Sequence, residues 1–302
     1  MFLSKEKDRE LIEQVKENPY VLKEIEIQTE AICLAAVKQC GWALEYVKEQ
    51  TYELCLEAVK SYGLALGYVK EQTYELCLEA VKQNGWALEY VKEQTEELCL
   101  EAVRQDGSAL EYVKNKTEEL CLEAVKSDGV ALKYVENQTK EMCLEALKQD
   151  GRNLWHIKNP TPEFCLKAVK QNGWALQYVK EQTEELCLEA VKQNGQALEF
   201  VKEKTSKICL EAVKQNGWAL QYIQNQTEAI CLFALLSDTL EGEENEYIYD
   251  FIHSPTEELE MIKELLVKST LRSYRQIRSL LARKRIQPHQ SLYHILEQLY
   301  PY

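Results

Sequence analysis

One threonine recurs along this chain of 302 residues at an unvarying spacing of 22 residues. It occupies ten positions: Thr29, Thr51, Thr73, Thr95, Thr117, Thr139, Thr161, Thr183, Thr205 and Thr227. A cysteine follows four residues after each of these threonines, and a glycine follows twelve residues after nine of them, from Gly41 to Gly217. A fixed period over ten copies is typical of a stacked array, in which each copy contacts its neighbours.

The copy that starts at Thr95 predicts two helices. Thr95 is a helix N-cap, and the two glutamates after it are favoured in the first turn by the helix dipole. The apolar spacing gives this first helix one buried face, formed by Leu98, Cys99, Ala102 and Val103. Asp106 and Gly107 predict its end, with the glycine in a left-handed conformation. A second, shorter helix is predicted from Ala109, Leu110, Tyr112 and Val113.

The predicted fold is therefore all-α. Neither helix of a copy is long enough to be stable alone, so stacking must bury the apolar faces. We expect an α-solenoid or superhelix of ten 22-residue helix–turn–helix repeats over residues 29–238, with helical caps at both ends. Residues 1–28 read as a degenerate N-terminal capping repeat. Residues 239–302 read as a C-terminal helical cap with an acidic segment and then a basic one.

The ten repeat cysteines are best interpreted as small buried apolar residues. Disulfides require Cα atoms roughly 4.4–6.8 Å apart, which is closer than equivalent positions in stacked repeats can lie. Zinc sites need several ligands converging from local spacings that this chain lacks. A reactive thiol needs an accessible, electropositive setting, whereas these cysteines lie between leucines on an apolar face. We expect no metal and no cofactor.

Composition and charge limit the expected function and location of the protein. The net charge of −14 argues against general binding to nucleic acid or anionic membranes. The sequence lacks an apolar run long enough to span a bilayer, and its first residues do not resemble a secretion signal. We therefore expect a cytoplasmic protein, in the producing cell or in a host cell. The sequence shows no phosphate-binding glycine loop, metal cluster or catalytic triad, so we do not expect an enzyme.

The residue after each repeat glycine varies among the copies. It reads Trp42, Leu64, Trp86, Ser108, Val130, Arg152, Trp174, Gln196 and Trp218. A position that accepts such different side chains is not a closed core site. The four tryptophans, Trp42, Trp86, Trp174 and Trp218, are candidates for a partner-binding stripe, because tryptophan is enriched at binding hot spots. The alternative is that each one packs on its own turn or on the next repeat.

The sixth copy departs most from the pattern, with the text "DGRNLWHIKNPTP". Arg152 follows the glycine, Trp155 stands where most copies have glutamate or glutamine, and His156 replaces a tyrosine. These three residues are candidates for partner binding. The anomaly could instead mark a bend or altered stacking in the array.

The C-terminal residues separate their charges. Ten acidic residues and one lysine fall between Asp238 and Glu264, whereas no acidic residue occurs from Lys268 to Arg285. Seven basic residues occupy that second stretch: Lys268, Arg272, Arg275, Arg278, Arg283, Lys284 and Arg285. Apolar residues at helical spacing run through it, which predicts a basic amphipathic helix. This helix could bind nucleic acid, lipid headgroups or an acidic partner, or it could cap the array.

The repeat unit, which reads "WALQYVKEQTEELCLEAVKQNG" from Trp174 to Gly195, resembles the tandem repeats of the family called domain of unknown function 4116. The resemblance covers roughly residues 26–239. It implies a repeat protein, often of viral or bacterial origin, without catalytic residues to transfer. We therefore expect a non-enzymatic scaffold that binds a protein, as an effector or inhibitor of a host or rival component. The alternative is binding of nucleic acid or an acidic partner through the basic helix.

Overall fold

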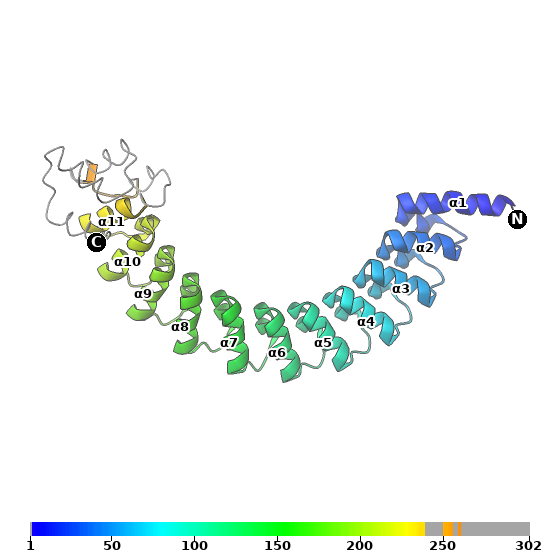
Figure 1. Cartoon of the computed structure of the whole chain (residues 1–302), viewed down its shortest axis with the longest axis horizontal. Helices are drawn as coiled ribbons and strands as arrows, with labels where there is room; N and C mark the ends of the chain where they lie inside the picture. The colour runs from blue at the N-terminus through cyan, green and yellow to red at the C-terminus, as the bar shows by residue number, and fades with distance from the viewer. Residues whose placement is uncertain (1, 239–249, 256–258, 261–302) are drawn as a thin grey trace, which may run out of the picture. The chain divides into compact units, whose positions relative to one another are not determined.

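The computed structural model of the protein describes residues 2–238, 250–255 and 259–260. The chain divides into two compact units, Met1–Gln149 and Asp150–Tyr302. Figure 1 shows the labelled helices following one another in chain order within each unit. The division falls inside the predicted array of residues 29–238, and the basic stretch from Lys268 to Arg285 lies outside the described residues.

One pair of elements recurs through both units: an α-helix of ten residues and a 3-10 helix of six. The first unit contains α2 (Glu30–Gln39), α3 (Tyr52–Ser61), α4 (Tyr74–Gln83), α5 (Glu96–Gln105), α6 (Glu118–Ser127) and α7 (Lys140–Gln149). Between them lie η2 (Gly41–Tyr46), η3 (Gly63–Tyr68), η4 (Gly85–Tyr90), η5 (Gly107–Tyr112) and η6 (Gly129–Tyr134). This confirms the all-α repeat architecture, and in these copies the second helix is a 3-10 helix.

The second unit continues the same pattern. Its elements are η7 (Gly151–His156), α8 (Pro162–Gln171), η8 (Gly173–Tyr178), α9 (Glu184–Gln193), η9 (Gly195–Phe200), α10 (Ser206–Gln215), η10 (Gly217–Tyr222) and α11 (Glu228–Asp238). Pro162 is the first residue of α8, where its missing N–H costs no intrahelical hydrogen bond.

The N-terminal residues form a degenerate copy of the same pair. Helix α1 (Phe2–Glu17) precedes η1 (Pro19–Glu24), and α1 packs on α2. Pro19 takes the position that glycine holds in later copies, and Asn18 caps η1 by accepting the backbone N–H of Tyr20 at 3.1 Å. The degenerate copy thus packs on α2, the first α-helix of the array.

The threonines cap the α-helices as their spacing predicts. The Thr95 hydroxyl accepts the backbone N–H of Leu98 at 3.3 Å, and nine of the ten repeat threonines make this bond. Thr29 is the exception, because its buried hydroxyl oxygen has no hydrogen-bond partner.

The repeat glycine has a different role from the one its sequence context suggests. The backbone of Gly107 lies outside the left-handed region, so the expectation of a left-handed cap is wrong for that residue, and the same holds for Gly63. A Cβ atom there would lie 2.6 Å from the carbonyl oxygen of Ala80 in the next copy. The preceding Asx residue caps the 3-10 helix, as when Asp106 accepts the N–H of Ser108 at 2.9 Å. Glycine is therefore required for close approach between copies.

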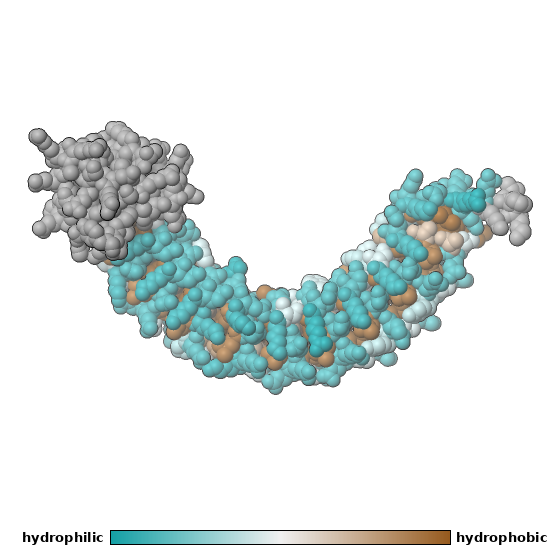
Figure 2. All heavy atoms as spheres, viewed as in Figure 1, coloured by the Kyte–Doolittle hydropathy of each residue, from teal (hydrophilic) through white to brown (hydrophobic). Residues whose placement is uncertain are grey.

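Packing buries an apolar layer between the two kinds of helix. Within Met1–Gln149, each α-helix from α3 to α6 packs on the neighbouring α-helices and on the 3-10 helices of its own and the preceding copy. Leu98, Ala102 and Val103 are buried at 0–1% exposure. All ten repeat cysteines are buried free thiols, as their interpretation as small apolar residues predicts. On the face visible in Figure 2, apolar side chains show as narrow bands between hydrophilic ridges.

Candidate functional site

The tryptophans that follow the repeat glycines pack on the next copy. Each ring contacts the aromatic residue near the end of the following 3-10 helix or its equivalent. The ring centroids are 5.4 Å apart for Trp42 and Tyr68, 5.8 Å for Trp86 and Tyr112, 5.5 Å for Trp174 and Phe200, and 5.9 Å for Trp218 and Phe251. This inter-repeat packing gives the recurring tryptophan a structural role. Partner binding at these four positions stays a prediction.

The four tryptophans differ in how much of the side chain reaches solvent. Trp86 is 40% exposed, and its indole Nε1–H donates to the Asp106 carboxylate at 2.7 Å. Trp42, Trp174 and Trp218 are half-buried. The rings do not form a uniformly open stripe, because each one is partly covered by the next copy.

Trp155 is the most exposed aromatic ring among the described residues, at 68%. It lies near the end of η7, at a position that holds glutamate, glutamine, lysine or glycine in the other copies. Its ring centroid is 5.4 Å from that of Tyr178 in the next copy, and the ring planes are tilted by 47°. The ring thus has one packed side and a large open area.

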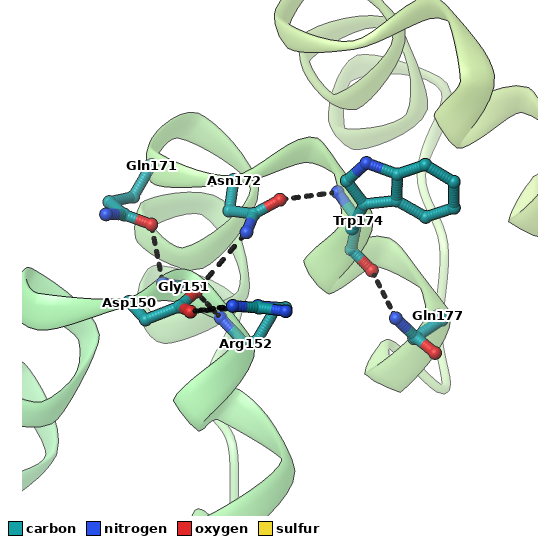
Figure 3. Close-up of polar contacts among 7 residues, drawn as sticks. All are labelled: Asp150, Gly151, Arg152, Gln171, Asn172, Trp174 and Gln177. Carbon is teal, nitrogen blue, oxygen red and sulfur yellow. Dashed lines mark hydrogen bonds and ion pairs between the residues drawn. The ribbon is translucent and has the colours of Figure 1, made fainter. Parts of the chain in front are cut away.

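Arg152 precedes Trp155 by three residues in the same 3-10 helix. Side chains three residues apart eclipse one another in a 3-10 helix, so the two residues share a face. The Arg152 guanidinium bonds the Asp150 carboxylate through Nε at 2.8 Å and through its terminal nitrogen at 2.7 Å. Figure 3 shows the Arg152 guanidinium beside the Asp150 carboxylate, joined to it by dashed lines.

Asp150 holds this arginine in place. Its carboxylate also accepts the Arg152 backbone N–H at 2.8 Å and the Asn172 amide at 3.3 Å (Figure 3). Partial burial opposes ionisation of Asp150, but the hydrogen bonds from Arg152 and Asn172 outweigh it and lower the pKa of the carboxyl group. The carboxylate is therefore ionised at neutral pH, and it orients the guanidinium without a contribution from a partner.

The next copy adds a third residue to this surface. Tyr178 ends η8 and is half-buried beneath the Trp155 ring. We call Arg152, Trp155 and Tyr178 the Trp155 patch. The sequence pointed to Arg152 and Trp155, but it gave Tyr178 no special role, since a tyrosine recurs at that position. Only the stacking of η7 on η8 brings the three residues together.

Two neighbours of the patch also depart from the repeat pattern. His156 is half-buried at the end of η7, where most copies have tyrosine. Asn153 is 6% exposed at a position where other copies have alanine, so the sixth copy buries a polar side chain in the apolar layer. The structure thus places the candidates Arg152, Trp155 and His156 on one short helix.

In the part of the chain that the structure describes, no group of three or more His, Cys, Asp or Glu side chains could hold a metal ion. Every helix in the described ranges is too short or too polar to cross a membrane. The seven basic residues of the C-terminal stretch lie outside these ranges, so their binding role stays a prediction.

Comparison with known proteins places the repeats in one family. The model of the family described as Domain of unknown function (DUF4116) matches seven overlapping segments: residues 29–73, 51–95, 73–117, 95–138, 117–160, 161–205 and 183–226. Each match spans about two copies of the repeat. No curated protein and no solved structure shows a significant match to the chain.

Proposed function

The chain belongs to the DUF4116 family of tandem repeats, and we propose that it is a non-enzymatic scaffold that binds a protein partner through the Trp155 patch. The observation that carries the proposal is the 68% exposure of Trp155 on an otherwise regular array. Placing such a large apolar surface in water is unfavourable, and the equivalent positions elsewhere carry polar residues or glycine. A partner that covers the ring would recover that free energy.

The composition of the patch supports protein binding. Tryptophan, tyrosine and arginine are the residue types enriched at interface hot spots. Arg152 is already ordered by Asp150 at 2.7 Å, and Trp155 is ordered by its contact with Tyr178. A partner would therefore lose little further side-chain entropy at these residues when it binds. The partner expected from this chemistry inserts an apolar side chain against the two rings.

The biological role in this proposal is that of an effector or inhibitor. Binding would occupy a surface of a host or rival protein, in the cytoplasm of the producing cell or of the host. The packing of η7 on η8 supports this role because it holds the side chains of the patch together. No chemical step is required of the chain.

The test replaces Trp155 by the residue that the array itself uses at this position. Trp155→Gln reproduces Gln177 and Gln221 of the seventh and ninth copies, so the variant should fold. Full-length protein and variant serve as baits in nuclease-treated lysate of the source cell or its host, and the captured proteins are identified by mass spectrometry. The affinity for the captured protein is then measured, with Gln221→Ala as the matched control.

We expect Trp155→Gln to weaken binding by about tenfold or more, as for an interface hot spot. The control should bind like the unchanged protein, because Gln221 lies outside the patch. Equal binding by Trp155→Gln and the unchanged chain would reject the Trp155 patch. Capture in untreated lysate that is absent in nuclease-treated lysate would direct attention to the basic C-terminal residues.

A further inference from the structure

A glutamine stands before seven of the ten repeat threonines, and it connects adjacent copies. Gln94 donates its side-chain amide to the carbonyl of Leu88 in its own copy at 3.3 Å and to that of Tyr112 in the next copy at 3.0 Å. Its Oε1 accepts the backbone N–H of Lys114 at 3.0 Å. Gln50 and Gln72 make the same three bonds. We call this residue the junction glutamine.

A lysine forms a second link at the same junctions. Its ammonium donates to the carbonyl of the equivalent residue in the preceding copy. Lys70 bonds the carbonyl of Lys48 at 3.0 Å, Lys92 that of Lys70 at 2.9 Å, and Lys114 that of Lys92 at 2.9 Å. Amide and ammonium together fill the junction with donors directed at backbone carbonyls.

Both links are replaced at the junction between η5 and η6. Lys116 stands in place of the junction glutamine, and Glu136 stands in place of the junction lysine. A lysine side chain has no acceptor, so Lys116 cannot accept a backbone N–H as Gln94 Oε1 does. An ionised glutamate has no donor, so Glu136 cannot bond the Lys114 carbonyl as Lys114 bonds that of Lys92.

A cleft opens where these two substitutions coincide. Its volume is about 380 Å³, and its lining includes Lys114, Lys116, Glu118, Cys121 and Glu136. The equivalent cleft three copies later keeps its junction glutamine, Gln182, and its lysine, Lys202, and it measures about 140 Å³. The cleft at Lys116 is thus more than twice as large as the one that a glutamine occupies.

We propose that the cleft at Lys116 binds a primary carboxamide from a ligand, in the place that the junction glutamine fills elsewhere. The carbonyl of Tyr134 is equivalent to those of Tyr112 and Phe200, which accept the amides of Gln94 and Gln182 at 3.0 Å. A carboxamide carries both a donor and an acceptor, which is the combination that Lys116 lacks. The carboxylate of Glu118, which also lines the cleft, adds an acceptor for its N–H groups.

The charge around the cleft favours a neutral polar ligand. The lining includes two lysines, Lys114 and Lys116, and two glutamates, Glu118 and Glu136. Lys114 is already engaged by the carbonyl of Lys92. The net charge of the lining is therefore close to balanced, and an anionic ligand gains no general attraction. The carboxamide can come from a free amide such as glutamine or from a glutamine side chain of a peptide.

Titration of the isotope-labelled full-length chain, followed by amide NMR shifts, tests the site. The two carboxamide probes are L-glutamine and acetyl-Gly-Gln-Gly-amide, and the matched controls are L-glutamate and acetyl-Gly-Glu-Gly-amide. We expect a carboxamide probe to shift the amide signals of Cys121 and Val135, and to bind at least about tenfold more tightly than its control. Response to the free amino acid alone identifies a small-molecule ligand, and response to the peptide alone identifies a protein segment.

Three variants test whether binding depends on the missing glutamine at position 116. Lys116→Gln restores the residue of the other junctions, so its own carboxamide should fill the cleft and abolish binding. Lys116→Ala removes the lysine without supplying a carboxamide and should retain binding. Lys204→Gln makes the same restoring change at a distant junction, where Lys204 bonds its own turn through the Val201 carbonyl at 3.0 Å, and should leave binding intact. Failure of both carboxamide probes, or equal binding by Lys116→Gln, would overturn the proposal.

Discussion

The side-chain amide of Gln94 donates to the carbonyl oxygen of Tyr112, eighteen residues further along the chain, at 3.0 Å. The same side chain accepts the backbone N–H of Lys114 at 3.0 Å and the thiol of Cys99 at 3.8 Å. One glutamine therefore joins the end of η4 to the end of η5 and reaches the start of α5. Gln94 stabilises the junction because it bonds polar groups that apolar stacking alone would leave without partners.

Replacing Gln94 by alanine should loosen the junction between η4 and η5. The change leaves the Lys114 N–H and the Tyr112 carbonyl without this partner, a loss of about 1–3 kcal/mol of local stability. Hydrogen exchange at the Lys114 amide measures it, because each 1.4 kcal/mol corresponds to about tenfold faster exchange. The control is Gln105→Ala, which changes an exposed glutamine at the end of α5. Equal exchange in both variants would contradict the role of Gln94.

The close approach of Gly63 to the Ala80 carbonyl leads to a second prediction. In Gly63→Ala, the new Cβ would lie 2.6 Å from the backbone carbonyl oxygen of Ala80, so α4 or η3 must shift. We expect a loss of about 1–3 kcal/mol, as for overpacking in a core. The midpoint of urea unfolding, followed by circular dichroism, measures the loss.

The matched control for Gly63 is Gly67→Glu in the same 3-10 helix. Gly67 is exposed, and glutamate is the residue that several other copies carry at its position. A Cβ atom there would lie 3.1 Å from a ring carbon of Tyr90, which is a partly exposed side chain and not backbone. This change should alter stability by no more than about 0.5 kcal/mol. If Gly63→Ala were as stable as Gly67→Glu, the backbone contact would not explain the recurrence of the glycine.

The repeat array could be predicted from the sequence, but the type of the second helix and the close contact at the glycine could not. The threonine spacing predicted the start of α5, and the apolar spacing predicted its buried Leu98 and Val103. The second element was expected as an ordinary short helix, because apolar residues three and four apart suit both helix types. The glycine was assigned to a left-handed cap because glycine commonly ends helices, whereas its real constraint is an atom of the next copy.

The candidate site was also only partly predictable from the sequence. Arg152 and Trp155 were visible in the sequence as departures from an otherwise repeated text. The contact of Trp155 with Tyr178 was not visible, because it depends on how η7 stacks on η8. The consequence of Lys116 was also missed, since a lysine in a polar loop carries no local signal of the cleft beside it.

The buried thiols predict a loss of stability at alkaline pH. Burial raises the pKa of the repeat cysteines above the ordinary value of 9.0, and for Cys231 it reaches about 11. In the folded state Cys231 stays protonated above pH 9.0, whereas in the unfolded chain it ionises. The free energy of unfolding is therefore unaffected by this group below pH 9.0 and falls as the pH rises from 9.0 to about 11.

Urea unfolding across this pH range, with a reductant present, measures the alkaline loss. Removal of the thiol by Cys231→Ala should make the fall with pH shallower, because one group that ionises on unfolding is gone. Cys40→Ala is the control, since Cys40 is only half-buried and lies outside the apolar layer. A pH dependence that is the same in Cys231→Ala and in the unchanged protein would exclude this thiol as a cause.

Thr95 and Thr29 differ in whether the threonine hydroxyl bonds the first turn of its helix. The Thr95 hydroxyl accepts the N–H of Leu98 at 3.3 Å, whereas the buried hydroxyl oxygen of Thr29 has no hydrogen-bond partner. Thr95→Ala should cost about 1 kcal/mol, because an N–H in the first turn of α5 loses its acceptor. Thr29→Ala should cost less or be neutral, because it removes a hydroxyl that is buried without a bond. Urea midpoints of the two variants measure the difference, and an equal cost would mean that the hydroxyl bond adds nothing to the cap.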